Sequence, residues 1–221
     1  MQRSYQIIDR DGWKRDMHCR IFENSVEPQY CISFELDITE FLRGCREQGY
    51  SFTFAMIYAA AICANETEEF RYRFLDGEVV LYDRIHTSFT YLEKGEELFK
   101  VVNVPMQNSM EAYVHAAHET AKAQKDYFTG PLGNDVYSFS PLPWISYTHI
   151  SHTNAGRKGN AVPLFDWGKY SERDGKIILP FSVQVHHSFV DGVHVGKFAG
   201  RLQNYLDTCF LLYYNDKNNR R

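Results

Sequence analysis

The sequence lacks the features of a membrane or secreted protein. No apolar run is long enough to span a bilayer, and residues 1–4 show no signal-peptide core. The five cysteines are scattered and odd in number, and no two form a CxxC pair. We therefore expect reduced thiols in place of a disulfide framework. Together these absences predict a cytoplasmic protein.

Other absences concern partners and domain organisation. The formal net charge is -4, and the only basic cluster is Arg220-Arg221, so a nucleic acid is not an expected partner. There is no internal repeat, and no GxSxG string of the kind serine hydrolases use. The 221 residues are 44% hydrophobic, which suits a single globular domain over residues 1–221. The polar residues 215–221 are expected to form a frayed tail.

Strands and helices can be predicted from local patterns. Alternation predicts strands at 30–36, 70–74, 79–82, 87–92 and 98–104, with hairpin turns at 76–77 and 174–175. Helices are predicted after a capping box at 37–40, over 52–65, and from Asn108 onward. Helix 52–65 is apolar nearly all round, so we expect it to be buried. His115 and His118 on the third helix are interpreted as surface residues.

The most informative stretch is HHSFVDG at residues 186–192. The alternating residues 177–185 predict a strand before it, and helical spacing over 198–209 predicts a helix after it. Alternation places His187 on the apolar side of the strand. Burial there would favour the neutral imidazole, the form that a general base requires.

Each residue of this stretch also has an ordinary structural explanation. A histidine at a strand end is more often structural than catalytic, Asp191 could simply cap the helix, and Gly192 could ease the turn. A metal site built from His186, His187 and His194 is a weaker idea, because their spacing across a strand-to-helix turn does not obviously bring the three side chains together. We therefore expect no bound metal.

The complete HHxxxDG pattern resembles the signature of the chloramphenicol acetyltransferase family. Condensation domains and the acyltransferase cores of 2-oxo acid dehydrogenase complexes share it more loosely. In that signature the base is the histidine four residues before the aspartate, here His187, which alternation also selects. Two more strings resemble the family: WKRDMH at 13–18 is similar to WxRxxHF, with Cys19 in place of its phenylalanine, and SPLPW at 140–144 is similar to SxLPW.

The resemblance implies roles for individual residues. Arg15 would form an ion pair with Asp191 that holds the strand end, and Ser140 would donate a hydrogen bond to the oxyanion of the tetrahedral intermediate. Acetyl-CoA would be a co-substrate, with no permanently bound cofactor. The implied fold is an α/β (α+β two-layer) arrangement in which helices flank a mixed, mostly antiparallel sheet. The implied assembly is a homotrimer with active sites at the subunit interfaces.

The expected activity is acetyl-CoA-dependent O-acetylation of an acceptor hydroxyl, with chloramphenicol or a similar alcohol as acceptor. Two alternatives are another alcohol or an amine as acceptor, and a non-catalytic protein that binds a hydrophobic ligand. Asp166 stands where the family usually has a hydroxyl residue that helps to hold a water in the transition state. His152 stands where an apolar pocket residue is usual. The predicted acceptor pocket comprises Phe22, Val26, Tyr30, Ile150, His152 and Asp166.

Overall fold

The computed structural model describes residues 4–129, 133–152 and 159–211. The predicted tail at 215–221 lies outside these residues. Within the described ranges, none of the helices combines the length and the apolar character that a bilayer crossing needs.

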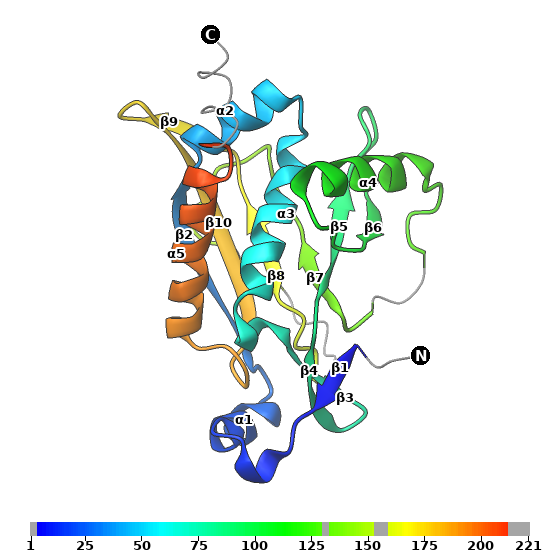
Figure 1. Ribbon diagram of the computed structural model, residues 1–221, viewed down its shortest axis with the longest axis vertical. Helices are drawn as coiled ribbons and strands as arrows, with labels where there is room; N and C mark the ends of the chain where they lie inside the picture. Colours follow the sequence, from blue (N-terminus) through cyan, green and yellow to red (C-terminus); the bar gives the residue numbers. More distant parts are fainter. Residues whose placement is uncertain (1–3, 130–132, 153–158, 212–221) are drawn as a thin grey trace.

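The described residues fold into strands and α-helices (Figure 1). In chain order they are β1 Tyr5–Ile7, α1 Asp16–Glu23, β2 Gln29–Asp37, α2 Thr39–Gln48, α3 Phe52–Asn65, β3 Tyr72–Leu75, β4 Glu78–Tyr82, β5 His86–Tyr91, β6 Lys100–Val104, α4 Met110–Ala123, β7 Val136–Phe139, β8 Leu164–Trp167, β9 Ser171–Arg173, β10 Lys176–His186 and α5 Gly192–Thr208.

The main sheet has the strand order β2-β10-β8-β7-β5-β6, and β9 pairs with the start of β10. Strand β10 is antiparallel to both β2 and β8, whereas β7 is parallel to its neighbours β8 and β5. A small antiparallel sheet, β1-β4-β3, stands beside it. The predicted mixed, mostly antiparallel sheet with flanking helices is confirmed.

Alternation along β10 separates the hydrophobic core from a polar face. Phe181, Val183 and Val185 are buried on the helix side, where the ring of Phe181 contacts Phe198 of α5. Ser182 and Gln184 point to the opposite face, as the two-residue period requires. Helices α3 and α5 cover the core side of the sheet, and the apolar helix α3 is buried between its neighbours (Figure 1). The opposite face of β10 therefore carries polar side chains, and Ser182 and Gln184 are buried there as well.

Several local predictions need correction at their boundaries. The strand predicted at 70–74 begins at Tyr72, because residues 68–71 form a 3-10 turn that buries Phe70. The predicted capping box at 37–40 is not formed, because the Asp37 carboxylate accepts instead from the backbone and hydroxyl of Thr39. The third helix begins at Met110 with Ser109 as its N-cap.

The predicted hairpin turn after β3 is confirmed. Asp76 and Gly77 both have positive φ, 52° and 87°, as a tight type I′ turn requires. Helix 52–65 has the predicted bounds and the predicted burial.

Candidate active site

The turn between β10 and α5 is held by the Arg15 guanidinium. Two of its nitrogens each lie 2.7 Å from a carboxylate oxygen of Asp191, so the ion pair is bidentate. The same guanidinium donates to the carbonyl oxygens of Ser188 at 2.7 Å and His187 at 3.0 Å. This pairing lowers the pKa of the Asp191 carboxyl, with the hydrogen bond from Arg15 as the largest cause. The Arg15 side chain thereby links the backbone of His187 and Ser188 to the carboxylate of Asp191.

His187 lies at the surface beside this ion pair. Its ring stacks on Phe22 with centroids 4.1 Å apart, and it also contacts Tyr30 at 4.8 Å. Tyr30 is itself anchored, because its hydroxyl donates to the carbonyl of Val190. Nδ1 of His187 lies 3.0 Å from Asp191 Oδ1, and the side chain is 38% exposed. Nδ1 is buried and forms no hydrogen bond with the described residues, so Nε2 is the nitrogen available to a substrate.

The prediction that His187 is desolvated by the apolar side of the strand is wrong. Side chains alternate between the two faces only within a strand, and β10 ends at His186, one residue before His187. The buried imidazole is that of His186, which is 2% exposed and packs against Phe74 and Phe189. Its Nδ1 accepts from the Ser188 N–H, and burial lowers its pKa to about 4. Burial thus keeps His186 neutral, and His187 is the accessible ring.

Asp191 and Gly192 open helix α5. Asp191 is the N-cap of α5 and forms a capping box with His194, in which the Asp191 N–H donates to His194 Nδ1 at 2.9 Å. Its carboxylate also pairs with Arg15, so Asp191 has both the ordinary capping role and the ion pair. A Cβ on Gly192 would meet no atom of the described residues within 4 Å, so none of these residues requires glycine there. No group of three or more potential metal ligands forms in the described parts of the chain.

We expect Arg15→Ala to lower the free energy of unfolding by about 2–3 kcal/mol. This loss lies between the typical costs of breaking a solvent-exposed ion pair and a buried ion pair. The reason is that Asp191 loses its cation while two carbonyls lose their donor; the two side chains are 14% and 31% exposed. Urea unfolding measures the change. Arg20→Ala is the matched control, since its pair with Asp16 is largely exposed on the arginine side. Equal losses in the two variants would contradict the bracing role of Arg15.

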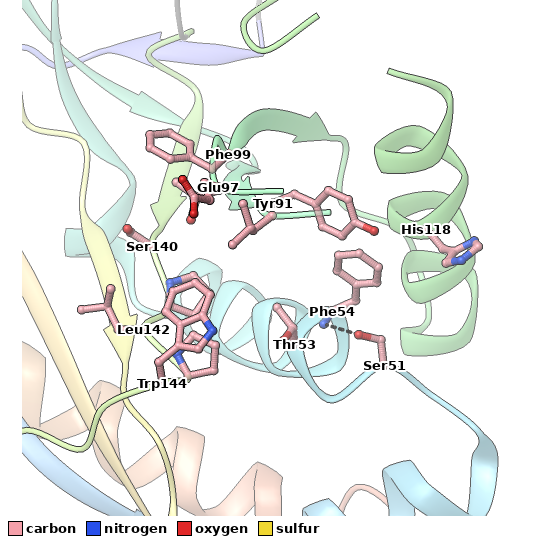
Figure 2. A pocket seen from close by; sticks show the side chains of 14 residues that line it. Ser51, Thr53, Phe54, Tyr91, Glu97, Phe99, His118, Ser140, Leu142 and Trp144 are labelled. Atoms are coloured by element: carbon pink, nitrogen blue, oxygen red, sulfur yellow. Dashed lines mark hydrogen bonds between the residues drawn. The ribbon is translucent and has the colours of Figure 1, made fainter. Parts of the chain in front are cut away.

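Ser140 lines a separate groove of about 540 Å³ (Figure 2). It directly follows β7, and its N–H donates to the Phe165 carbonyl of β8. In Figure 2, Ser140 stands on one wall of the groove with Leu142 and Trp144, and Phe54 and Tyr91 form the other side. His118, interpreted from the sequence as a surface residue, is exposed and also lines this groove. Sequence reasoning missed the groove because its walls come from α3, β5, α4 and the residues after β7.

Ser140 and His187 of one chain are too far apart to act on one carbonyl. The sheet register places Ser140 beside Asp166, and Asp166 opposite Ser182. His187 follows Ser182 by five residues, which corresponds to about 16 Å along the strand, and it lies two strands away from β7. The two predicted catalytic groups therefore occupy different parts of one chain's surface.

The predicted acceptor residues divide between these two regions. Phe22 and Tyr30 contact His187, whereas His152 and Asp166 pair with each other on the polar face of the sheet, with His152 Nε2 3.0 Å from Asp166 Oδ2. Val26 is 95% exposed in the single chain, and its place in an acceptor pocket stays a prediction. Ile150 is half-buried. A small pocket of about 160 Å³ is lined by Glu27, Gln29, Tyr30, Cys31, Ser151, His152 and Gln184.

Comparison with known proteins gives a consistent result. The family model of chloramphenicol acetyltransferase matches residues 3–203. A chloramphenicol acetyltransferase of Escherichia coli is 29% identical over 206 residues, 92% of this chain and 94% of that protein. One of Streptomyces acrimycini is 30% identical over 210 residues, 90% and 93% of the two chains.

Solved structures agree with this result. A chloramphenicol acetyltransferase structure superimposes with a TM-score of 0.84 at 29% identity, covering 91% of this chain and 99% of that one. The dihydrolipoamide acetyltransferase of Azotobacter vinelandii shares the fold, with a TM-score of 0.63 at 19% identity and coverage of 89% and 88%. The chain belongs to the chloramphenicol acetyltransferase family.

Proposed function

We propose that this chain transfers the acetyl group of acetyl-CoA to an acceptor hydroxyl, with chloramphenicol as the first candidate acceptor. The proposal rests on the contacts that orient the His187 side chain. Phe22 stacks on the imidazole, Tyr30 contacts it at a tilt, Asp191 Oδ1 lies 3.0 Å from Nδ1, and 38% of the side chain stays exposed. This is how a general base is oriented with one nitrogen open to its substrate. The five free cysteines support a cytoplasmic location.

The proposed reaction is a direct transfer between two bound substrates. His187 Nε2 removes the proton of the acceptor hydroxyl as that oxygen attacks the thioester carbonyl. The Ser140 hydroxyl donates a hydrogen bond to the resulting oxyanion. Collapse of the intermediate breaks the carbon–sulfur bond, and the CoA thiolate takes the proton back from His187. Binding both substrates side by side supplies the proximity that makes an acyl-enzyme unnecessary.

The groove that contains Ser140 fits the thioester end of acetyl-CoA. Its walls are mostly apolar and aromatic, from Phe54 and Tyr91 to Trp144, as expected for a slender, largely uncharged pantetheine arm. Ser140 lies among these walls, so a thioester seated in the groove would bring its carbonyl oxygen to the hydroxyl.

Because His187 and Ser140 lie apart in one chain, we infer that each active site combines two subunits. The His187 surface of one copy would meet the Ser140 groove of the next. Such a contact joins two different surfaces, so it must repeat around a closed ring to avoid an open filament. The homotrimer implied by the family resemblance is the simplest such ring.

The activity is tested by following thiol release from acetyl-CoA with a chromogenic reagent. We expect release only when chloramphenicol or another alcohol is present, and an O-acetyl ester detected by mass spectrometry. An amide product would assign an amine acceptor. Binding of a hydrophobic ligand with no thiol release from any acceptor would support the non-catalytic alternative and overturn the proposal.

The two-subunit site is tested with two inactive variants. His187→Ala and Ser140→Ala chains are unfolded together in equal amounts and refolded. We expect the mixture to recover about a quarter of wild-type activity, because about a quarter of the interfaces then combine an intact His187 with an intact Ser140. Each variant refolded alone is the control and should stay inactive. A mixture that remains as inactive as its components would place the whole site within one chain.

A further inference from the structure

A third histidine lies beside the motif turn, and the mechanism above does not use it. His194 is in the first turn of α5 and is 9% exposed. Its Nδ1 accepts the backbone N–H of Asp191 at 2.9 Å and so completes the capping box of the helix. Glutamate or glutamine usually holds this position of a capping box. A histidine there makes the cap depend on a ring that titrates near neutral pH.

Glu69 faces the other nitrogen of this ring. Because Nδ1 accepts a hydrogen bond, the neutral imidazole carries its proton on Nε2. Nε2 lies 3.4 Å from Oε1 of Glu69, which belongs to the 3-10 turn that precedes β3. The two side chains are 11% and 28% exposed. The carboxylate therefore lies on the side of the ring that bears the proton, which favours the ring orientation that the cap needs.

These contacts continue to the proposed base. Asp191, which His194 holds by its backbone N–H, has Oδ1 3.0 Å from Nδ1 of His187. Arg15 joins the same carboxylate to the carbonyl oxygen of His187. A line of contacts thus runs from Glu69 through His194 and Asp191 to His187. It connects the turn before β3 with the residue that would accept the substrate proton.

The cap can form only while the His194 ring is neutral. Protonation would place an N–H on both nitrogens, so Nδ1 would face the Asp191 N–H as a second donor. Burial is the largest cause of the lowered pKa of His194, and the positive charges of Arg15 and Lys197 also lower it, whereas Glu69 and Asp191 raise it. The N-terminal end of a helix also disfavours a cation. The neutral, capping form is therefore the favoured form near pH 7.

We propose that His194, faced by Glu69, is a positioning residue for His187 and fixes the motif turn only in its neutral form. The inference rests on the proposed acetyl transfer. Transfer then needs two neutral imidazoles, one to accept the substrate proton and one to accept the Asp191 N–H. As the pH falls, protonation of His194 removes the acceptor of that N–H, and Asp191 is no longer held beside His187. The rate should then fall more steeply than protonation of the base alone requires.

The first experiment compares how kcat/KM depends on pH in the wild-type chain and in His194→Gln. Glutamine accepts the N-cap N–H in an ordinary capping box and does not titrate. On logarithmic axes, we expect the acid limb of the wild-type profile to steepen to a slope of about two and that of His194→Gln to keep a slope of about one. His194→Ala should lower kcat by about tenfold at neutral pH, and His194→Gln should recover most of this loss. Equal slopes, or no recovery by glutamine, would overturn the inference.

Glu69→Gln tests the second partner in the opposite direction. It removes the negative charge that raises the pKa of His194, so this ring should bind its proton only at lower pH. The steep part of the acid limb should therefore move to lower pH, whereas a variant that merely loosened the fold would move it to higher pH. Glu66→Gln is the control, because Glu66 forms an exposed pair with Arg201, and it should leave the profile unchanged. Circular dichroism at each pH establishes that the variants stay folded. A Glu69→Gln profile that stays in place or moves to higher pH contradicts the role of Glu69.

Hydrogen exchange tests the cap without any turnover. At a single neutral pH, we expect the peptide that contains residues 187–195 to exchange about tenfold faster at its most protected amides in His194→Ala than in the wild-type chain, with His194→Gln close to wild type. If no acceptor is acetylated, the proposed function fails, and this exchange pattern alone decides whether His194 holds the turn. If acetyl transfer proceeds and His194→Ala keeps wild-type turnover and exchange, the proposed function stands and the positioning role is rejected.

Discussion

His187→Ala should reduce kcat for acetyl transfer by about 10³-fold while the protein stays folded, in the middle of the range for general acid–base catalysis. We propose that the imidazole takes the proton from the acceptor, so its loss removes the general base. Its side chain is 38% exposed, so its loss leaves no large cavity in the core. Thiol release measures the rate, and urea unfolding should show a change of about 1 kcal/mol or less.

The matched control for this variant is His115→Ala, because His115 is an exposed histidine on α4 that does not itself line the groove. It should keep wild-type turnover. If His187→Ala released CoA at the wild-type rate with the same acceptor, His187 could not be the base. The histidine paired with Asp166 would then be the next residue to examine.

Ser140→Ala should reduce kcat by about 10²–10³-fold with little change in KM, as expected when one oxyanion donor is removed. The hydroxyl interacts with charge that develops only after the acceptor oxygen attacks, so it contributes little to ground-state binding. Steady-state kinetics with varied acetyl-CoA separates the two parameters. The backbone should be undisturbed, because the Ser140 N–H bond to Phe165 remains.

Ser138→Ala is the control for the oxyanion donor. Ser138 lies two residues earlier, within β7, and does not line the groove. Its substitution should change kcat by less than about twofold if the effect is specific to the groove hydroxyl. A Ser140→Ala variant that raised KM and left kcat intact would show that Ser140 binds substrate and does not stabilise the oxyanion.

Much of the local structure could be predicted from the sequence. The burial of α3 followed from an apolar run with no polar face, and the turn at Asp76-Gly77 followed from the need for positive φ. The pairing of Arg15 with Asp191, 176 positions apart, could be expected only through family resemblance. Local patterns reflect the steric and solvation preferences of each segment by itself. Local structure can therefore be predicted without knowledge of the tertiary fold.

The burial of His186 and the exposure of His187 could not be predicted from local patterns. Alternation describes a strand, but the ladder ends at His186, and the turn after it gives each ring its own surroundings. The environment of a residue just past a strand is decided by what packs on it. For His187 these contacts are Phe22 and Tyr30, and for His186 they are Phe74 and Phe189.

The sequence by itself determined the main helices and strands, the hairpin turns, and the motif that identifies the family. The tertiary structure decided which histidine is buried, that Ser140 lines a groove, and that His187 lies far from that groove. The physical reason is that these properties depend on contacts between segments distant in the chain. Strand register and side-chain packing establish such contacts only when the whole sheet has formed.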